Sequence, residues 1–304
     1  MSTNNALNIV GLTNTTAAQV TTLVSQYHTN EFRLTLTSGD PTNQAAVTAA
    51  TTIYLCPYLG NTIALFNGTT WDTITSAQVS IAVPATTATN YDIFAYNNAG
   101  TLAMELTAWT NSTTRATALV YQDGVLVKSG DATRRFMGSF RTTGVSGQTE
   151  STATNRLITN YYNRVMLPLN QAPADATWTW SGTYGSWRAA NGNTTTNAIS
   201  VMLCDPATSE NIYLVYQIGT KSNGTSVTVI VGIGLDGADP VNTRGFGAGL
   251  STAFVPAIGV YSTSTATGYH TLLPYEYLSG STDTVTFYKT VGIVVGSFRG
   301  YLWG

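Results

Sequence analysis

Short alternations of apolar and polar residues, separated by tight turn signals, are the feature that most restricts the fold of this chain. Phe32, Leu34 and Leu36 alternate with polar neighbours, as expected when successive side chains of a strand point to opposite faces. Similar runs flank turn sequences at Asn67-Gly68, Asn98-Ala99-Gly100 and Asp123-Gly124, which are typical of β-hairpins. The pattern predicts antiparallel sheets rather than alternating strands and helices.

Helical periodicity is confined to the beginning of the sequence. Ala17, Val20, Leu23, Val24 and Tyr27 recur at helical spacing after possible capping residues, which predicts one short amphipathic helix. The stretch 43–50 is compatible with a second, shorter helical turn.

A chain of 304 residues exceeds the usual size of one domain, so we expect more than one folded unit. The small polar stretch Leu169–Asp175, which contains one proline, is the candidate boundary. We therefore predict an N-terminal attachment segment at 1–31, a β domain at 32–170 and a jelly-roll-like β domain at 176–304. The predicted fold class is mainly β, with antiparallel β-sandwich or jelly-roll domains and a short N-terminal helix.

Charge is scarce in this chain. Asp, Glu, Lys and Arg make up 9% of the residues, against about a quarter in an ordinary soluble protein, and Thr supplies about one residue in six. Such a composition favours sheets that face water with uncharged side chains. With a net charge of -2 and three lysines, no basic stripe is expected to bind nucleic acid. Neither an export signal nor a membrane-spanning run is visible, so we expect no membrane insertion.

Residues that could carry cofactor or metal chemistry are few. Gly232 to Gly237 match the G-x-G-x-x-G spacing, but the proline and glycines that follow cannot continue into the helix that a dinucleotide site requires. His28 and His270 are the only histidines, and Cys56 and Cys204 the only cysteines, without metal-ligand spacing. We expect no cofactor, no metal site and no enzymatic activity.

Glycan cleavage is the enzymatic alternative, because it requires only two suitably spaced carboxyl groups. The candidates would be Glu105, Asp123, Asp131, Glu150, Asp236 and Glu276. Most of them lie at turns, where Asp is expected for local hydrogen bonding.

Aromatic residues are better placed for adhesion than the charged residues are for catalysis. The candidates for a glycan-binding or subunit-contact role are Tyr161, Tyr162, Trp178, Trp180 and Trp187, since aromatic rings with polar tips suit both. Packing in a core or an interface is the simpler interpretation for each of them.

The first half of the chain resembles a family of structural proteins from tailed bacteriophages and prophages. The matching sequences are RLTLTSGDP at 33–41, IYLCPYLGNTIALFNGTTW at 53–71, YDIFAYNNAGTLAMELTAWTNSTTRAT at 91–117, QDGVLVKSGDATRRFMGSFRTT at 122–143 and NRLITNYYNRV at 155–165. Weaker similarity is found in WRAANGN at 187–193 and GYHTLLPYEY at 268–277. The resemblance implies a virion component with β-sandwich domains, assembled as a homo-oligomer, and it implies no catalytic site.

From this resemblance we expect a virion location, contacts with other virion proteins and assembly as a homotrimer. The leading expectation is a tail fibre or spike that adheres to a receptor or glycan on the host cell. A head decoration or head-fibre protein is the alternative, and a capsule-degrading hydrolase is a third.

Overall fold

The computed structural model describes residues 28–204, 212–224, 227–240, 245–248, 254–263, 265–279, 283–291 and 294–304. For Gly245–Ala248 and for residues 263, 291, 294 and 295, only the backbone is described. The helix predicted within the first 27 residues lies outside the described residues.

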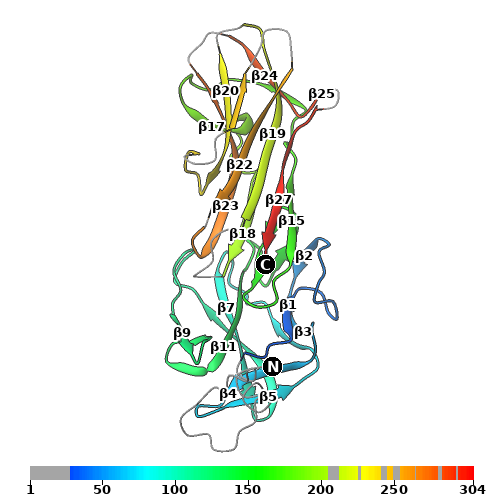
Figure 1. Ribbon diagram of the computed structural model, residues 1–304, viewed down its shortest axis with the longest axis vertical. Coiled ribbons are helices and arrows are strands. Elements are labelled where there is room, and N and C mark those ends of the chain that lie inside the picture. Colours follow the sequence, from blue (N-terminus) through cyan, green and yellow to red (C-terminus); the bar gives the residue numbers. More distant parts are fainter. Residues whose placement is uncertain are drawn as a thin grey trace, which may run out of the picture.

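The strands before about residue 160, except those at 47–50, 149–151 and 155–156, form three sheets in the lower part of the molecule in Figure 1. A three-stranded sheet has the order β1-β3-β6, and β4 and β5 form a hairpin beside it. A six-stranded sheet has the order β8-β7-β11-β10-β9, with β14 also paired to β11. The strands are β1 Phe32–Thr35, β3 Thr52–Pro57, β4 Thr62–Phe66, β5 Trp71–Thr75, β6 Val79–Ala82, β7 Asn90–Asn98, β8 Thr101–Ala108, β9 Leu119–Gln122, β10 Val125–Lys128, β11 Asp131–Arg141 and β14 Ile158–Asn160.

The upper part contains two large sheets and a small hairpin. An eight-stranded sheet has the order β2-β12-β13-β18-β23-β20-β21, with β17 paired to β23. Its strands are β2 Val47–Ala50, β12 Thr149–Ser151, β13 Asn155–Arg156, β17 Trp187–Ala189, β18 Ile199–Leu203, β20 Thr228–Leu235, β21 Gly245–Ala248 and β23 Gly268–Leu278, and the 3-10 turn η1 Ala190–Gly192 adjoins it.

The second large sheet has six strands in the order β15-β27-β19-β24-β16, with β22 paired to β19. These are β15 Met166–Gln171, β16 Thr177–Thr179, β19 Ile212–Ser222, β22 Val255–Thr263, β24 Val285–Tyr288 and β27 Ser297–Trp303, and β25 Thr290–Val291 pairs with β26 Val294–Val295. Among the described strands, all pairings are antiparallel except that of β13 with β18. The predicted mainly β fold with antiparallel sandwich sheets is therefore confirmed.

Two large hydrophobic cores, the largest of four clusters among the described residues, hold most of these sheets together. The larger core lies between the two large sheets and includes Tyr216, Ile218, Val231, Leu272 and Phe287. The main core of the lower part includes Phe32, Leu34, Ile93 and Phe140. Burying an aliphatic or aromatic side chain contributes about 1.5–3 kcal/mol, so each core can stabilise its own set of strands.

The lower and upper parts are joined by strands as well as by the chain. β15 pairs with β27 along its whole length, although almost all of β15 falls within the β domain predicted at 32–170. At the junction Arg33 donates a hydrogen bond of 2.7 Å to the carbonyl oxygen of the C-terminal Gly304, which lies near the middle of the long axis in Figure 1.

The hairpins occur where the turn sequences predict them. Asp123 and Gly124 join β9 to β10 with φ of 50° and 83°, the conformation that selects Asp-Gly in such a turn. The helical turn considered for 43–50 is wrong, because Val47 and Ala50 pair with β12 as strand β2. Gly232 and Gly234 lie inside β20, which ends in a turn at Asp236.

Candidate binding surface

The outward face of the sheet formed by β15, β27, β19 and β22 is the candidate binding surface. Along β19, Ile212, Leu214 and Tyr216 are buried in the core, whereas the alternate residues are partly exposed. The outward side chains that lie side by side are Met166 and Pro168 on β15, Arg299, Tyr301 and Trp303 on β27, Tyr213, Val215 and Gln217 on β19, and Ile258 and Val260 on β22. We call this surface, together with Lys221 farther along the same face of β19, the open face.

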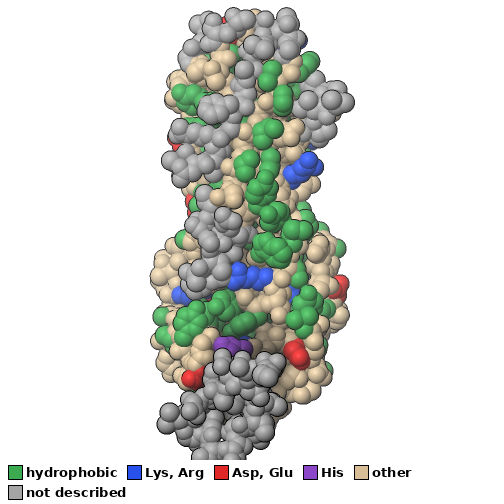
Figure 2. Space-filling model, viewed as in Figure 1, with side chains coloured by type: hydrophobic (Ala, Val, Ile, Leu, Met, Phe, Trp, Pro, Cys, Tyr) green, Lys and Arg blue, Asp and Glu red, His purple; other side chains and the backbone are tan. Residues whose placement is uncertain are grey.

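The open face is largely apolar and aromatic. Trp303 is 46% exposed and lies opposite Met166, which is 50% exposed. Tyr301 stacks on Tyr213 with ring centroids 5.4 Å apart and planes 23° apart. Figure 2 shows hydrophobic side chains following the middle of the upper part, over the strands that Figure 1 labels β19 and β27. An exposed apolar area this continuous is typical of an interaction site.

A shallow hollow of about 320 Å³ lies within the open face. It is lined by Tyr213, Val215, Gln217, Ser297, Arg299, Gly300 and Tyr301. The rings supply flat apolar area, while Gln217, Ser297 and Arg299 supply hydrogen-bonding groups at the sides. This combination can bind a ligand that has both apolar faces and hydroxyl or carboxylate groups.

Both cations of the open face lack a carboxylate partner among the described residues. Arg299 is exposed on β27 and forms no ion pair there. Lys221 also points outward from β19, and its ammonium lies 5.2 Å from the centre of the Phe254 ring. No described Asp or Glu belongs to this face, so its local charge is positive.

The five aromatic residues singled out from the sequence lie elsewhere. Trp178 and Trp180 are buried in the larger core, where Trp178 stacks on Phe287 at 5.7 Å. Tyr161 and Tyr162 pack edge to face at 4.8 Å in the lower part. Trp187 is half-buried against Tyr277. A ligand-binding role for these five residues stays a prediction, whereas the open face was not singled out, although the alternation over Ser297–Trp303 could have indicated a strand there.

Of the carboxylates considered for glycan cleavage, only the pair Glu105 and Asp131 lies close together; the others lie apart from one another. Glu105 and Asp131 both lie beside Arg134, with Glu105 at 2.6 Å and Asp131 at 3.7 Å from its nitrogens. Burial alone would raise the pKa of Glu105, but hydrogen bonds from Lys128 and Arg134 outweigh it and lower the pKa. A hydrogen bond from Thr133 lowers the pKa of Asp131. Both groups are therefore carboxylates at neutral pH, whereas glycosidases require one protonated acid.

The other carboxylates have structural partners. Asp123 accepts a hydrogen bond from the Trp71 indole at 3.0 Å. Burial raises the pKa of Glu150. Asp236 contacts Nδ1 of His270 at 2.8 Å and accepts from the Thr271 N–H at 2.9 Å; burial opposes these bonds, but together they lower the pKa of Asp236.

Glu276 is the most unusual of the carboxylates because it is fully buried. It accepts hydrogen bonds from the Trp178 indole at 2.7 Å and from Arg188 at 3.2 Å. Burial raises its pKa to about 7, although Arg188 and Trp178 oppose the rise. Its position inside the core leaves no access for a substrate.

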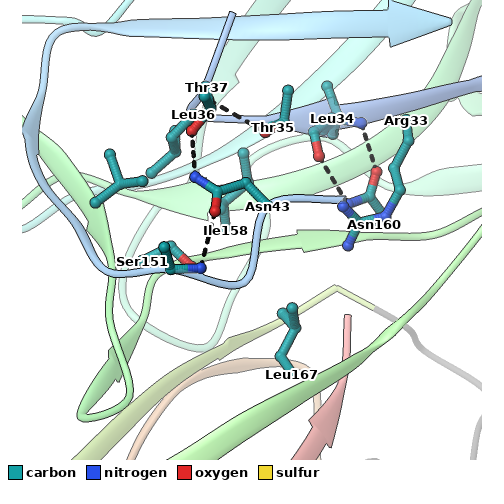
Figure 3. A pocket seen from close by; sticks show the side chains of 12 residues that line it. Arg33, Leu34, Thr35, Leu36, Thr37, Asn43, Ser151, Ile158, Asn160 and Leu167 are labelled. Carbon is teal, nitrogen blue, oxygen red and sulfur yellow. Dashed lines mark hydrogen bonds between the residues drawn. The ribbon is translucent and has the colours of Figure 1, made fainter. Parts of the chain in front are cut away.

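Two further hollows have a different character. The larger, of about 560 Å³, lies beside β9 and is lined by Thr113, Thr114, Arg115, Ala118, Leu119, Tyr121, Leu126 and Thr267. Its cation is neutralised, because Arg115 pairs with Asp92 at 2.9 Å. The smaller, of about 20 Å³, is shown in Figure 3, where Asn43 contacts Thr37 and Asn160 bonds the backbone of Leu34. It has room for about one water molecule.

The described part of the chain contains no group of three His, Cys, Asp or Glu side chains arranged to hold a metal ion. No helix long and apolar enough to cross a membrane occurs among the described residues.

Comparisons with known proteins do not identify a family for this chain. No protein-family model matches it, and no curated protein matches it. Among solved structures, the insecticidal delta-endotoxin Cry8Ea1 from Bacillus thuringiensis has a TM-score of 0.25 and 9% identity over 93% of this chain and 55% of that chain. A family 43 arabinoxylan arabinofuranohydrolase from Bacillus subtilis in complex with cellotetraose has a TM-score of 0.23 and 14% identity over 83% of this chain and 65% of that one.

The structure of infectious bursal disease virus, Gx strain, has a TM-score of 0.19 and 12% identity, over 90% of this chain and 75% of that chain. The chain thus spans less than two thirds of the toxin and of the hydrolase. Similarities with TM-scores this low show neither a common fold nor a common function.

Proposed function

We propose that this chain is a structural component of a tailed-bacteriophage virion, a fibre- or spike-type appendage whose open face adheres to glycan on the host cell. The sequence resemblance at 33–165 supports the virion assignment. The open face supports adhesion, because stacked tyrosines there are flanked by Gln217, Ser297 and Arg299. Stacking and hydrogen bonding together are what a surface needs in order to hold a sugar.

The protonation and the positions of the carboxyl groups support a structural role without catalysis. Glu105 and Asp131 lie together but are both held ionised by their neighbours, and the carboxyl group with the raised pKa, Glu276, is inside the core. Assembly as a homotrimer belongs to the same proposal, and the number three comes only from the phage resemblance. Several copies on one particle would turn weak single sites into firm attachment.

Binding of the full-length chain to host cells tests the adhesion. Tyr301→Ala should reduce the bound fraction, because it removes half of the stacked pair on the open face. Tyr121→Ala is the matched control, since Tyr121 is exposed on β9, outside the open face. Equal binding by both variants and the original chain would contradict the assignment of adhesion to the open face.

Gold-labelled antibody against the chain, applied to intact particles, tests the location. Label at the tail tip or fibres is the expected result. Label distributed over the head would favour the decoration alternative, and particles without label would contradict the virion assignment.

A further inference from the structure

We infer that the open face binds acidic polysaccharides, in which uronic acid carboxylates pair with Arg299 and Lys221 while sugar rings stack on the tyrosines beside Arg299. This inference rests on the proposed adhesive function and adds the chemical class of the ligand. The evidence for it is the positive charge of the face, whereas the proposed adhesive function depends on the aromatic rings.

The position of Arg299 allows its guanidinium to bind a carboxylate of a ligand. It lies next to Tyr301 on β27 and opposite Val215 on β19, and its guanidinium has no carboxylate partner among the described residues. The other arginines of known environment are engaged: Arg115 pairs with Asp92 and Arg188 with Glu276. A planar guanidinium that is exposed and unpaired can bind a carboxylate through two parallel hydrogen bonds.

Lys221 provides a second cation on the same face. It lies six positions beyond Val215 on β19, which corresponds to about 20 Å along a strand. Phe254 lies against its ammonium group and against Tyr288, with the two ring centroids 4.9 Å apart. The face therefore presents aromatic surface near both of its positive charges.

The spacing favours a polymer over a small ligand. A single sugar acid could reach only one of two cations that lie about 20 Å apart along the sheet, whereas a chain laid along β19 passes both. The hollow of about 320 Å³ beside Arg299 would hold one or two rings of such a chain.

A second copy of this chain is the competing occupant of the open face, because apolar side chains such as Trp303 and Ile258 are exposed there. The charges argue against it. A copy that presented the same face would bring Arg299 and Lys221 but no described carboxylate to pair with them. Like charges brought together without partners oppose association.

The test compares two polymers with the same sugar backbone, one with ionised carboxylates and one with neutral methyl esters. The full-length chain is titrated at low salt with polygalacturonate and with fully methyl-esterified polygalacturonate, and binding is measured by biolayer interferometry. We expect polygalacturonate to bind about tenfold more tightly, with salt weakening only that binding. Arg299→Gln should weaken binding of polygalacturonate about threefold, because Lys221 keeps its share of the preference, and should leave binding of the methyl ester unchanged.

Lys128→Gln is the matched control, because it removes the same charge from β10 while Glu105 keeps its contact with Arg134. Equal binding of both polymers would overturn the inference and leave glycan adhesion standing. Binding of neither polymer would also overturn it, and the host-cell experiment would then decide separately on adhesion. Sedimentation that shows self-association abolished by Trp303→Asp, with no polymer bound, would assign the open face to contact between copies.

Discussion

The indole Nε1 of Trp178 donates a hydrogen bond of 2.7 Å to the carboxyl group of Glu276, inside the core between the two large sheets. The two residues are 98 positions apart in the sequence, and Glu276 has no exposed surface. Arg188 approaches the same carboxyl group from β17. The hydrogen bonds of this buried carboxyl group connect three strands, because Trp178 lies on β16, Arg188 on β17 and Glu276 on β23. Its protonation state therefore affects the free energy of unfolding.

The first prediction concerns the pH dependence that this acid imposes. Burial raises the pKa of Glu276 from 4.5 to about 7, so the folded protein retains a proton that the unfolded chain releases. The contribution of Glu276 to stability is fully present below about pH 4.5 and is lost as the pH rises to about 7. Because each pKa unit corresponds to about 1.4 kcal/mol, the loss should approach about 3 kcal/mol.

Chemical denaturation of the full-length chain at pH 4.5 and pH 8, followed by tryptophan fluorescence, measures this loss. Glu276→Gln keeps an acceptor for Trp178 but cannot ionise, so its stability should change less between the two pH values. An identical change in both proteins would show that Glu276 is not the titrating group.

The second prediction compares two adjacent arginines on β11. Arg135 is buried and donates hydrogen bonds to the carbonyl oxygens of Ala64 at 2.8 Å and Thr29 at 2.9 Å. Arg135→Met leaves these buried acceptors without their charged donor, which should cost about 1–3 kcal/mol for each unsatisfied acceptor. Arg134 is partly exposed and pairs with Glu105 near the surface, so Arg134→Met should cost less than about 1 kcal/mol.

Urea unfolding of both variants measures the two costs. Similar losses for Arg134→Met and Arg135→Met would contradict the difference in burial on which the comparison depends.

The hairpins show what the sequence could predict about this fold. Asp123 and Gly124 determine a turn through their own backbone preferences, so the strands on either side follow from local information. The stretch 43–50 behaved differently. Val47 and Ala50 form a strand only because β12, about 100 residues later, pairs with them, and a local pattern contains no information about that partner.

The open face and the carboxylate partner of His270 could not be predicted from the sequence, for two separate reasons. On β19, Ile212 and Leu214 alternate with Tyr213 and Val215, and because both sets are apolar the sequence does not show which set faces water. Asp236 and His270 are 34 positions apart, so the orienting partner that the sequence did not reveal for His270 depends on the pairing of distant strands.

The third prediction concerns the close approach of β11 and β14. A Cβ atom added at Gly138 would lie 2.2 Å from the carbonyl oxygen of Thr159 and 3.0 Å from Leu34. The β11–β7 register also shifts between Phe136 and Gly138. Because the nearest atom belongs to the backbone of a paired strand, Gly138→Ala should destabilise the lower part by about 1–3 kcal/mol.

Gly144 is the matched control for this substitution. Nothing lies within 4 Å of a Cβ atom added there, so Gly144→Ala should leave the unfolding midpoint nearly unchanged. Equal midpoints for the two variants would contradict the close contact of β11 with β14.

The fourth prediction is that the pair Glu105 and Asp131 does not cleave glycan. Lys128 contacts Glu105 at 2.5 Å and Arg134 contacts it at 2.6 Å, which favours the ionised form that cannot donate a proton to a leaving group. Incubation of the full-length chain with host capsule or lipopolysaccharide should therefore release no defined oligosaccharides. If chromatography shows such products and Glu105→Gln abolishes them without loss of folding, the scaffold proposal is wrong. Asp123→Asn serves as the control, because Asp123 lies at a separate turn where it accepts a hydrogen bond from Trp71.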